Sequence, residues 1–85
     1  MKEITYKITD AMGIHARPAG LLVKKASEYK SEIFVSKGDK TVDAKKIFGV
    51  MSLGAKCDEE IKFTIKGEDE EKAAEELQKF LADNL

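Results

Sequence analysis

The sequence of 85 residues has few of the residues that define several classes of small protein. It contains one cysteine (Cys57), one histidine (His15), one proline (Pro18) and no tryptophan. One cysteine cannot form an internal disulfide, and one cysteine with one histidine is too few ligands for a structural zinc site. No apolar run approaches the roughly 18 residues of a membrane span, and the first ten residues lack the apolar segment of a signal peptide. We therefore expect no metal site, no membrane insertion and a cytoplasmic location.

The chain also lacks a net charge of either sign. Its 15 basic and 16 acidic residues give a formal charge of -1, which argues against nucleic acid as the partner. The neutrality is a cancellation, because residues 1–56 hold 11 basic and 6 acidic side chains (+5) and residues 57–85 hold 4 and 10 (-6). This asymmetry predicts a positive face that docks acidic protein partners, with the acidic C-terminal helix turned elsewhere.

Periodicity in the sequence predicts seven elements. Apolar and polar residues alternate strictly in residues 3–9 and alternate again in 60–66, as in strands with one polar face. Residues 32–36 are rich in strand-forming residues, with Ile33 and Val35 on the core side, and a turn at residues 37–40 leads to a further strand at 41–44. Helical spacing predicts helices from Ala16 to before Ser31, over residues 45–53, and for about three turns after an N-cap at Asp69. Because each strand has a polar face, we expect a single α+β domain over residues 1–85. It is an open-faced β-sandwich in the order βαββαβα, a four-stranded antiparallel sheet covered on one face by three helices.

The histidine, an arginine and the proline lie together in residues 13–19. Pro18 suits the first turn of a helix, so it places the helix start at about Ala16. The unpaired backbone N–H groups of Ala16 and Arg17 then form an anion site beside His15. The helix-end potential favours a neutral imidazole and a negatively charged group beside it, and the Arg17 guanidinium matches phosphoryl oxygens. From the residues alone, a cap or a packing residue is the more usual interpretation of a histidine in the position of His15, and Arg17 could equally be a solvated side chain, so the function stays open at this point.

Two segments carry a resemblance to a known family. Residues 13–19 (GIHARPA) resemble the active-site signature of HPr, the histidine-containing phosphocarrier of the bacterial phosphoenolpyruvate–sugar phosphotransferase system, and residues 45–54 (KKIFGVMSLG) resemble its second signature. The length and the element order also match that family from end to end. The resemblance implies that His15 accepts a phosphoryl group on Nδ1 from phospho-enzyme I and passes it to the A domain of a sugar-specific enzyme II. Ala16 and Arg17 would hold that group. It further implies a monomeric carrier without a cofactor, more a substrate of enzymes than a stand-alone enzyme.

The same resemblance implies partner docking by residues around His15, on the first and second helices. The spacing of the apolar members of this set is also that of core residues, and helical spacing alone mildly favours that interpretation. The neighbouring lysine pairs at 24–25 and 45–46 fit either a solvated face or recognition of an acidic partner. The implied docking residues are Gly20, Lys24, Ile47, Phe48 and Met51.

Some positions depart from the family pattern. Lys46 stands where many HPr proteins carry a serine that a kinase phosphorylates, so we expect no serine-linked control at this position, and Ser52 is interpreted as a structural hydroxyl. Met12 replaces a more usual polar residue, and Gly20 costs about 1 kcal/mol relative to alanine in a helix. Two alternatives remain: a paralogue serving a nitrogen-linked or other regulatory phosphotransfer branch, and a non-catalytic module that binds RNA or a partner strand through a sheet face carrying Phe34.

Overall fold

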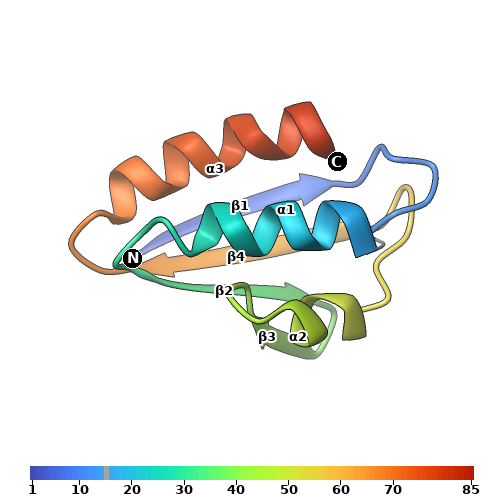
Figure 1. Cartoon of the computed structure of the whole chain (residues 1–85), viewed down its shortest axis with the longest axis horizontal. Helices are drawn as coiled ribbons and strands as arrows, with labels where there is room; N and C mark the ends of the chain where they lie inside the picture. Colours follow the sequence, from blue (N-terminus) through green and yellow to red (C-terminus); the bar gives the residue numbers. More distant parts are fainter. Residues whose placement is uncertain (15) are drawn as a thin grey trace.

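Seven elements follow one another in the order that the sequence predicts. The computed structural model describes residues 1–14 and 16–85, so the predictions for His15 fall outside the described residues. The order of elements is βαββαβα, which confirms the prediction (Figure 1). The strands are β1 (Lys2–Lys7), β2 (Glu32–Lys37), β3 (Lys40–Asp43) and β4 (Glu60–Lys66), and the helices are α1 (Ala16–Ala26), α2 (Ile47–Ser52) and α3 (Glu70–Asn84).

Several elements differ in their bounds from the prediction, among them α1, which ends at Ala26 rather than just before Ser31, and α2, which is Ile47–Ser52 rather than residues 45–53. β1 ends at Lys7, whereas the alternating pattern continues to Thr9, because the Thr9 N–H leaves the sheet and donates to the main-chain oxygen of Leu85 at 2.6 Å. α3 has 15 residues, about four turns, because its polar residues continue the helix beyond both ends of the apolar stripe. In the described part of the chain, no helix combines the length and the apolar character needed to cross a membrane.

The four strands form one antiparallel sheet in the order β1, β4, β2, β3. β4 is therefore a central strand, and its alternate residues meet apolar residues of both neighbours. Phe63 lies opposite Ile4 of β1 and Val35 of β2, and Ile65 lies opposite Ile33 of β2. Because side chains alternate along a strand, these residues all project from one face of the sheet.

All three helices lie on that apolar face, with α1 between α3 and α2 (Figure 1). This arrangement confirms the open-faced β-sandwich. Leu22 of α1, Val50 of α2 and Leu77 of α3 are fully buried against the sheet. The opposite face of the sheet carries mainly polar side chains, and Phe34 of β2 is exposed there, as the alternation predicted.

At the start of α3, contacts from a distant segment replace a local helix cap. Asp69 occupies the predicted N-cap position, but its side chain makes no capping hydrogen bond. The carboxylate instead accepts hydrogen bonds from the Ser31 hydroxyl and from the N–H groups of Lys30 and Ser31, the latter two at 3.0 Å. The Ser31 hydroxyl, followed by the Lys30 N–H, lowers the pKa of Asp69 from 3.8 to about 2. Asp69 therefore ties the loop between α1 and β2 to α3.

Candidate functional site

The N terminus of α1 is open to solvent and electropositive. α1 begins at Ala16, which confirms the start predicted from Pro18. Ala16 and Arg17 are exposed, and the first turn contains no acidic residue, so no carboxylate of the helix itself offsets the positive potential of its end. The N–H groups of Ala16 and Arg17 have no acceptor within the helix and none elsewhere among the residues described. These are the two donors that the sequence predicts beside His15.

The loop between β1 and α1 is anchored on two sides. On one side, the Ile14 N–H donates to the Ala55 carbonyl at 2.9 Å. On the other, the N–H groups of Thr9 and Asp10 donate to the main-chain oxygen of Leu85 at 2.6 and 2.7 Å. The chain is therefore fixed immediately before it reaches the helix start.

Gly13 lies at the closest approach of this loop to the segment after α2. Its φ of +68° is in the left-handed region, which favours glycine. A Cβ at this position would lie 2.4 Å from the Ala55 carbonyl oxygen and 2.7 Å from the Lys56 Cα. Both are backbone atoms, so no flexible side chain can move aside, and only glycine fits here.

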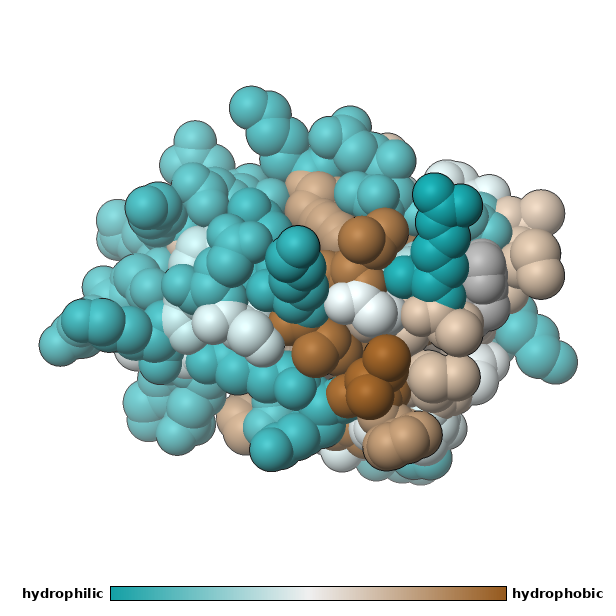
Figure 2. Space-filling view, in the orientation of Figure 1, coloured by the Kyte–Doolittle hydropathy of each residue, from teal (hydrophilic) through white to brown (hydrophobic). Residues whose placement is uncertain are grey.

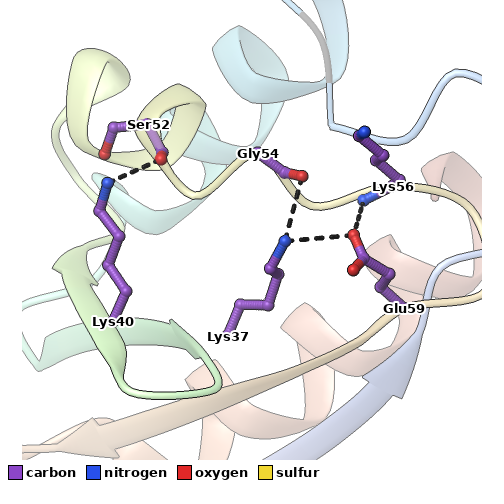
Figure 3. Close-up of polar contacts among 6 residues, drawn as sticks. All are labelled: Lys37, Lys40, Ser52, Gly54, Lys56 and Glu59. Atoms are coloured by element: carbon purple, nitrogen blue, oxygen red, sulfur yellow. Dashed lines mark hydrogen bonds and ion pairs between the residues drawn. The ribbon is translucent and has the colours of Figure 1, made fainter.

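The segment after α2 is itself held by a lysine of the β2–β3 hairpin (Figure 3). Lys37 Nζ lies 3.3 Å from the Gly54 carbonyl oxygen and 3.2 Å from Glu59 Oε1. Glu59 Oε1 also accepts a hydrogen bond from the Lys56 N–H at 2.7 Å. The Lys56 N–H, and after it Lys37, lower the pKa of Glu59 below its usual value. The hairpin thus supports the surface on which the loop before α1 rests.

A second hairpin lysine fixes the end of α2 (Figure 3). Lys40 Nζ donates to the Ser52 carbonyl at 2.7 Å, at a helix C terminus where a cation is favourable. The Ser52 hydroxyl donates to the Gly49 carbonyl at 2.6 Å, which supports its interpretation as a structural hydroxyl. The short helix α2 is therefore held in place from its C-terminal end.

The Arg17 side chain is exposed and makes no ion pair within the described part of the chain. It borders a shallow hollow of about 240 Å³ that the last turn of α3 also borders. Most of α3 lies on the far side of α1 from α2 (Figure 1), but the prediction that the acidic helix is turned away is wrong for this last turn. The lining residues are Asp10, Arg17, Pro18, Leu21, Asp83 and Asn84.

Several large apolar side chains of the two helices are exposed. Ile47, Phe48 and Met51 of α2 are 38%, 84% and 40% exposed, and Leu21 of α1 is 43% exposed. The interpretation of the three α2 residues as core is therefore wrong, because only Val50 of this helix is buried. Apolar surface gathers on this face over α1 and α2, bordered by hydrophilic surface (Figure 2). We call Leu21, Ile47, Phe48 and Met51 the apolar patch.

Gly20 of α1 lies beside Ile47 of α2. A Cβ at Gly20 would lie 3.8 Å from Ile47 Cδ1, which is an ordinary van der Waals distance. Arg17, Gly20 and Lys24 recur at intervals of three and four residues, so they lie along one face of α1. The structure therefore brings the predicted docking residues of both helices onto one surface, next to the start of α1.

The four lysines near this surface divide into two kinds. Lys25 makes ion pairs with two carboxylates of the protein, at 3.6 and 3.7 Å, and Lys45 Nζ donates to a main-chain carbonyl after α1 at 2.8 Å. Lys24 and Lys46 are exposed, and neither makes an ion pair with a residue that the structure describes. Only Lys24 and Lys46 are thus available to a partner without breaking an internal contact.

Sequence reasoning did not place Met12, Leu21 or Asp83 on this surface. Met12 is 71% exposed at the tip of the loop, where its N–H donates to Asp10 Oδ1 at 2.8 Å. The exposure of Leu21 could have been inferred from the helical pattern. Adjacent residues of a helix point about 100° apart, so Leu21 faces a different direction from the buried Leu22. No local signal connects Asp83 with Arg17, since the two are far apart in the chain.

The site is an open surface rather than an enclosed cavity. A hollow of about 720 Å³ runs along the charged outer side of α3 and includes none of the predicted site residues. Among residues 1–14 and 16–85, no group of three or more histidine, cysteine, aspartate or glutamate side chains is placed to hold a metal ion.

The family model described as the PTS HPr component phosphorylation site matches residues 2–83. A crystal structure of HPr from Thermoanaerobacter tengcongensis is 43% identical, with a TM-score of 0.93, over 99% of this chain and 94% of that one. A Mycoplasma histidine-containing phosphocarrier protein is 33% identical, with a TM-score of 0.92, over 96% and 93%. The Bacillus subtilis catabolite repression protein Crh, described as a domain-swapped dimer, is 35% identical with a TM-score of 0.78, over 94% and 92%.

The open-faced β-sandwich with the element order βαββαβα is the architecture that this chain shares with the HPr structure. The chain belongs to the HPr family of phosphocarrier proteins of the phosphotransferase system, because the family model covers nearly all of it. The resemblance drawn from the two signatures is thereby confirmed. Whether this chain is a monomer stays a prediction, since one relative is described as a dimer.

Proposed function

We propose that this chain takes a phosphoryl group from phospho-enzyme I on His15 and passes it to the A domain of a sugar-specific enzyme II in the cytoplasm. In the first step a neutral imidazole nitrogen of His15 attacks phosphorus, an N–P bond forms, and the bond from phosphorus to the donor breaks. In the second step the N–P bond at His15 breaks as the group moves to the acceptor. No oxidant, reductant or water is consumed in either transfer.

One observation carries this proposal: the open start of α1, with its two unpaired N–H groups and Arg17, adjoins the apolar patch. The N–H groups and the guanidinium supply donors for phosphoryl oxygens, which are the main requirement of phosphoryl transfer. They lie at the surface, where solvent limits how strongly they hold an anion. A carrier needs such modest stabilisation, because it must release the group as readily as it receives it.

The apolar patch gives the partner a place to dock. Phe48 is the most exposed large apolar side chain of the described residues, and aromatic anchors contribute much of the binding energy at protein interfaces. Lys24 and Lys46 add positive charge without an internal partner. We therefore propose that Gly20, Lys24, Ile47, Phe48 and Met51 contact enzyme I and the enzyme II A domain, and that this contact weakens as salt rises.

Labelling tests the transfer step. Purified protein with enzyme I and phosphoenolpyruvate should acquire one acid-labile phosphate, and the His15→Ala variant should acquire none. Persistent labelling of His15→Ala would remove His15 from the mechanism. Normal labelling without sugar phosphorylation, when a sugar-specific enzyme II is added, would favour the regulatory-branch paralogue.

A matched pair of variants tests docking. Phe48→Ala on α2 should raise the KM for phosphorylation by enzyme I about tenfold or more, at unchanged stability, since an interface hot spot contributes about 2 kcal/mol. Phe34→Ala removes an exposed phenylalanine from the opposite face of the sheet and should leave the KM unchanged. Equal effects of the two variants would contradict docking at the apolar patch.

A further inference from the structure

The turn before β4 contains a residue in an unfavourable backbone conformation. Asp58 has a φ of +71°, and it is the one residue other than glycine with a positive φ among those that the structure describes. The left-handed region is unfavourable for a residue with a Cβ, and such conformations persist only where the surrounding contacts impose them. The contacts of this turn therefore identify what holds it.

The turn lies directly against the loop before α1. The Asp58 N–H donates to the Ile8 carbonyl at 2.8 Å, near the start of that loop. At the other end of the loop, the Ile14 N–H donates to the Ala55 carbonyl at 2.9 Å. Ile14 is the residue next to the proposed phosphoryl acceptor. The segment of residues 54–59 thus contacts both ends of the loop, so a movement of this segment displaces the backbone beside the acceptor.

Two charged side chains, Lys37 of β2 and Glu59, hold this segment (Figure 3). Lys37 Nζ lies 3.3 Å from the Gly54 carbonyl oxygen and 3.2 Å from Glu59 Oε1. Glu59 Oε1 also accepts the Lys56 N–H at 2.7 Å. The contacts of the pair therefore fall on both sides of Ala55, and they connect the segment to a strand of the sheet.

We propose that Lys37 and Glu59 are positioning residues for the phosphoryl transfer, because they fix the segment that holds the backbone of Ile14. Both act through the Ala55 carbonyl, and neither has to touch the phosphoryl group. Phosphoryl transfer depends on the placement of the acceptor in line with the donor, and a small misplacement of a reacting group lowers the rate strongly. This inference rests on phosphorylation of His15 as proposed above.

Single-turnover transfer from phospho-enzyme I separates positioning from docking. Glu59→Gln removes the charge that binds Lys37 but keeps an oxygen for the Lys56 N–H, and Lys37→Met removes the cation. Each variant should lower the maximal transfer rate about fivefold or more, because the acceptor is misplaced. The half-saturating concentration of the carrier should not change, because the apolar patch is intact. Lys37→Arg keeps a cation and should transfer at the normal rate.

Lys62→Met is the matched control. Lys62 Nζ lies 3.2 Å from Glu3 Oε2, the same separation as in the Lys37–Glu59 pair, but on the open face of the sheet. Lys62→Met should leave the rate and the half-saturating concentration unchanged. An equal loss of rate in this control or a normal rate in Glu59→Gln would overturn the proposal. So would an effect of Lys37→Met confined to the half-saturating concentration, which would make Lys37 a docking residue.

Hydrogen exchange tests the same contacts without phosphorylation. In Glu59→Gln and Lys37→Met, the Ile14 amide should exchange with solvent about two- to fivefold faster, the range for an exposed charge pair. The Ala44 amide, which donates to a carbonyl of β2 at 2.9 Å, should exchange as before. Unchanged exchange at Ile14 would overturn the proposed coupling. If His15 took up no phosphate, the proposed function would fail, whereas this exchange would still decide whether the pair holds the loop.

Discussion

Replacing Gly13 by alanine tests how closely the loop before α1 rests on the segment after α2. The left-handed backbone at φ +68° costs an alanine about 1–2 kcal/mol. The added Cβ would also lie 2.4 Å from the Ala55 carbonyl oxygen, about 1 Å inside ordinary contact, so the two backbones must separate. Separation breaks the 2.9 Å bond from the Ile14 N–H to Ala55, for about 1 kcal/mol more. We expect a total loss of about 2–3 kcal/mol.

Gly38 provides the matched control. Its φ of +59° imposes a similar backbone cost, but a Cβ there meets no atom within 4 Å. Gly38→Ala should therefore cost only about 1–2 kcal/mol. In urea unfolding, with a slope of about 1 kcal/mol/M, the midpoint of Gly13→Ala should lie about 1 M below that of Gly38→Ala.

The same pair separates stability from function. Gly13→Ala displaces the chain two residues before His15, so its initial rate of phosphorylation by enzyme I should fall by tenfold or more. The assay is carried out without urea, at a temperature at which the variant is fully folded. Gly38→Ala lies in the hairpin and should be phosphorylated at the normal rate. Equal unfolding midpoints for the two variants would refute the steric part of this reasoning, and a normal rate in Gly13→Ala would refute its link to the site.

Three further outcomes are expected. The pKa of Asp69 is lowered to about 2 in the folded protein, so its ionised carboxylate stabilises the fold fully above pH 4. In thermal melts, the loss of stability in Asp69→Asn should therefore be full at neutral pH and shrink as the pH falls from 4 to 2. A loss of stability that does not depend on pH would contradict this reasoning. Lys46→Ser should raise the free energy of unfolding by about 1 kcal/mol, because Lys46 has extended N-cap geometry and makes no capping bond; Lys46→Ala should gain less. Gly20→Ala should also gain about 1 kcal/mol in urea unfolding, since its Cβ meets Ile47 at ordinary distance, and a loss would show that the helices cannot accept it.

The parts of the fold that the sequence predicts well depend on local rules. The alternation in β4 reproduces its observed bounds, Glu60–Lys66, because a half-buried strand repeats every two residues. Pro18 locates the start of α1 because it suits the first helical turn. In both cases a few neighbouring residues determine the geometry.

The parts that could not be predicted depend on which distant segments meet. α2 has six residues, too few for a periodic pattern to show which side is buried, so the exposure of Phe48 required the structure. Asp69 looks like a helix cap in the sequence, yet its carboxylate bonds to Ser31. Lys45 has the same charge as Lys46, but only the position of a carbonyl after α1 shows that Lys45 is internally engaged.

The distribution of charge around the site also depends on which distant segments meet in the fold. Summed along the chain, the basic part contains Arg17 and the acidic part contains Asp83, which suggests two separate faces. The fold brings the end of α3 back beside the start of α1, so these opposite charges share one hollow. A purely positive site would hold a phosphoryl group more firmly than a carrier requires. Arg17 therefore shares its surroundings with acidic residues, while Lys24 and Lys46 remain exposed to attract acidic partners.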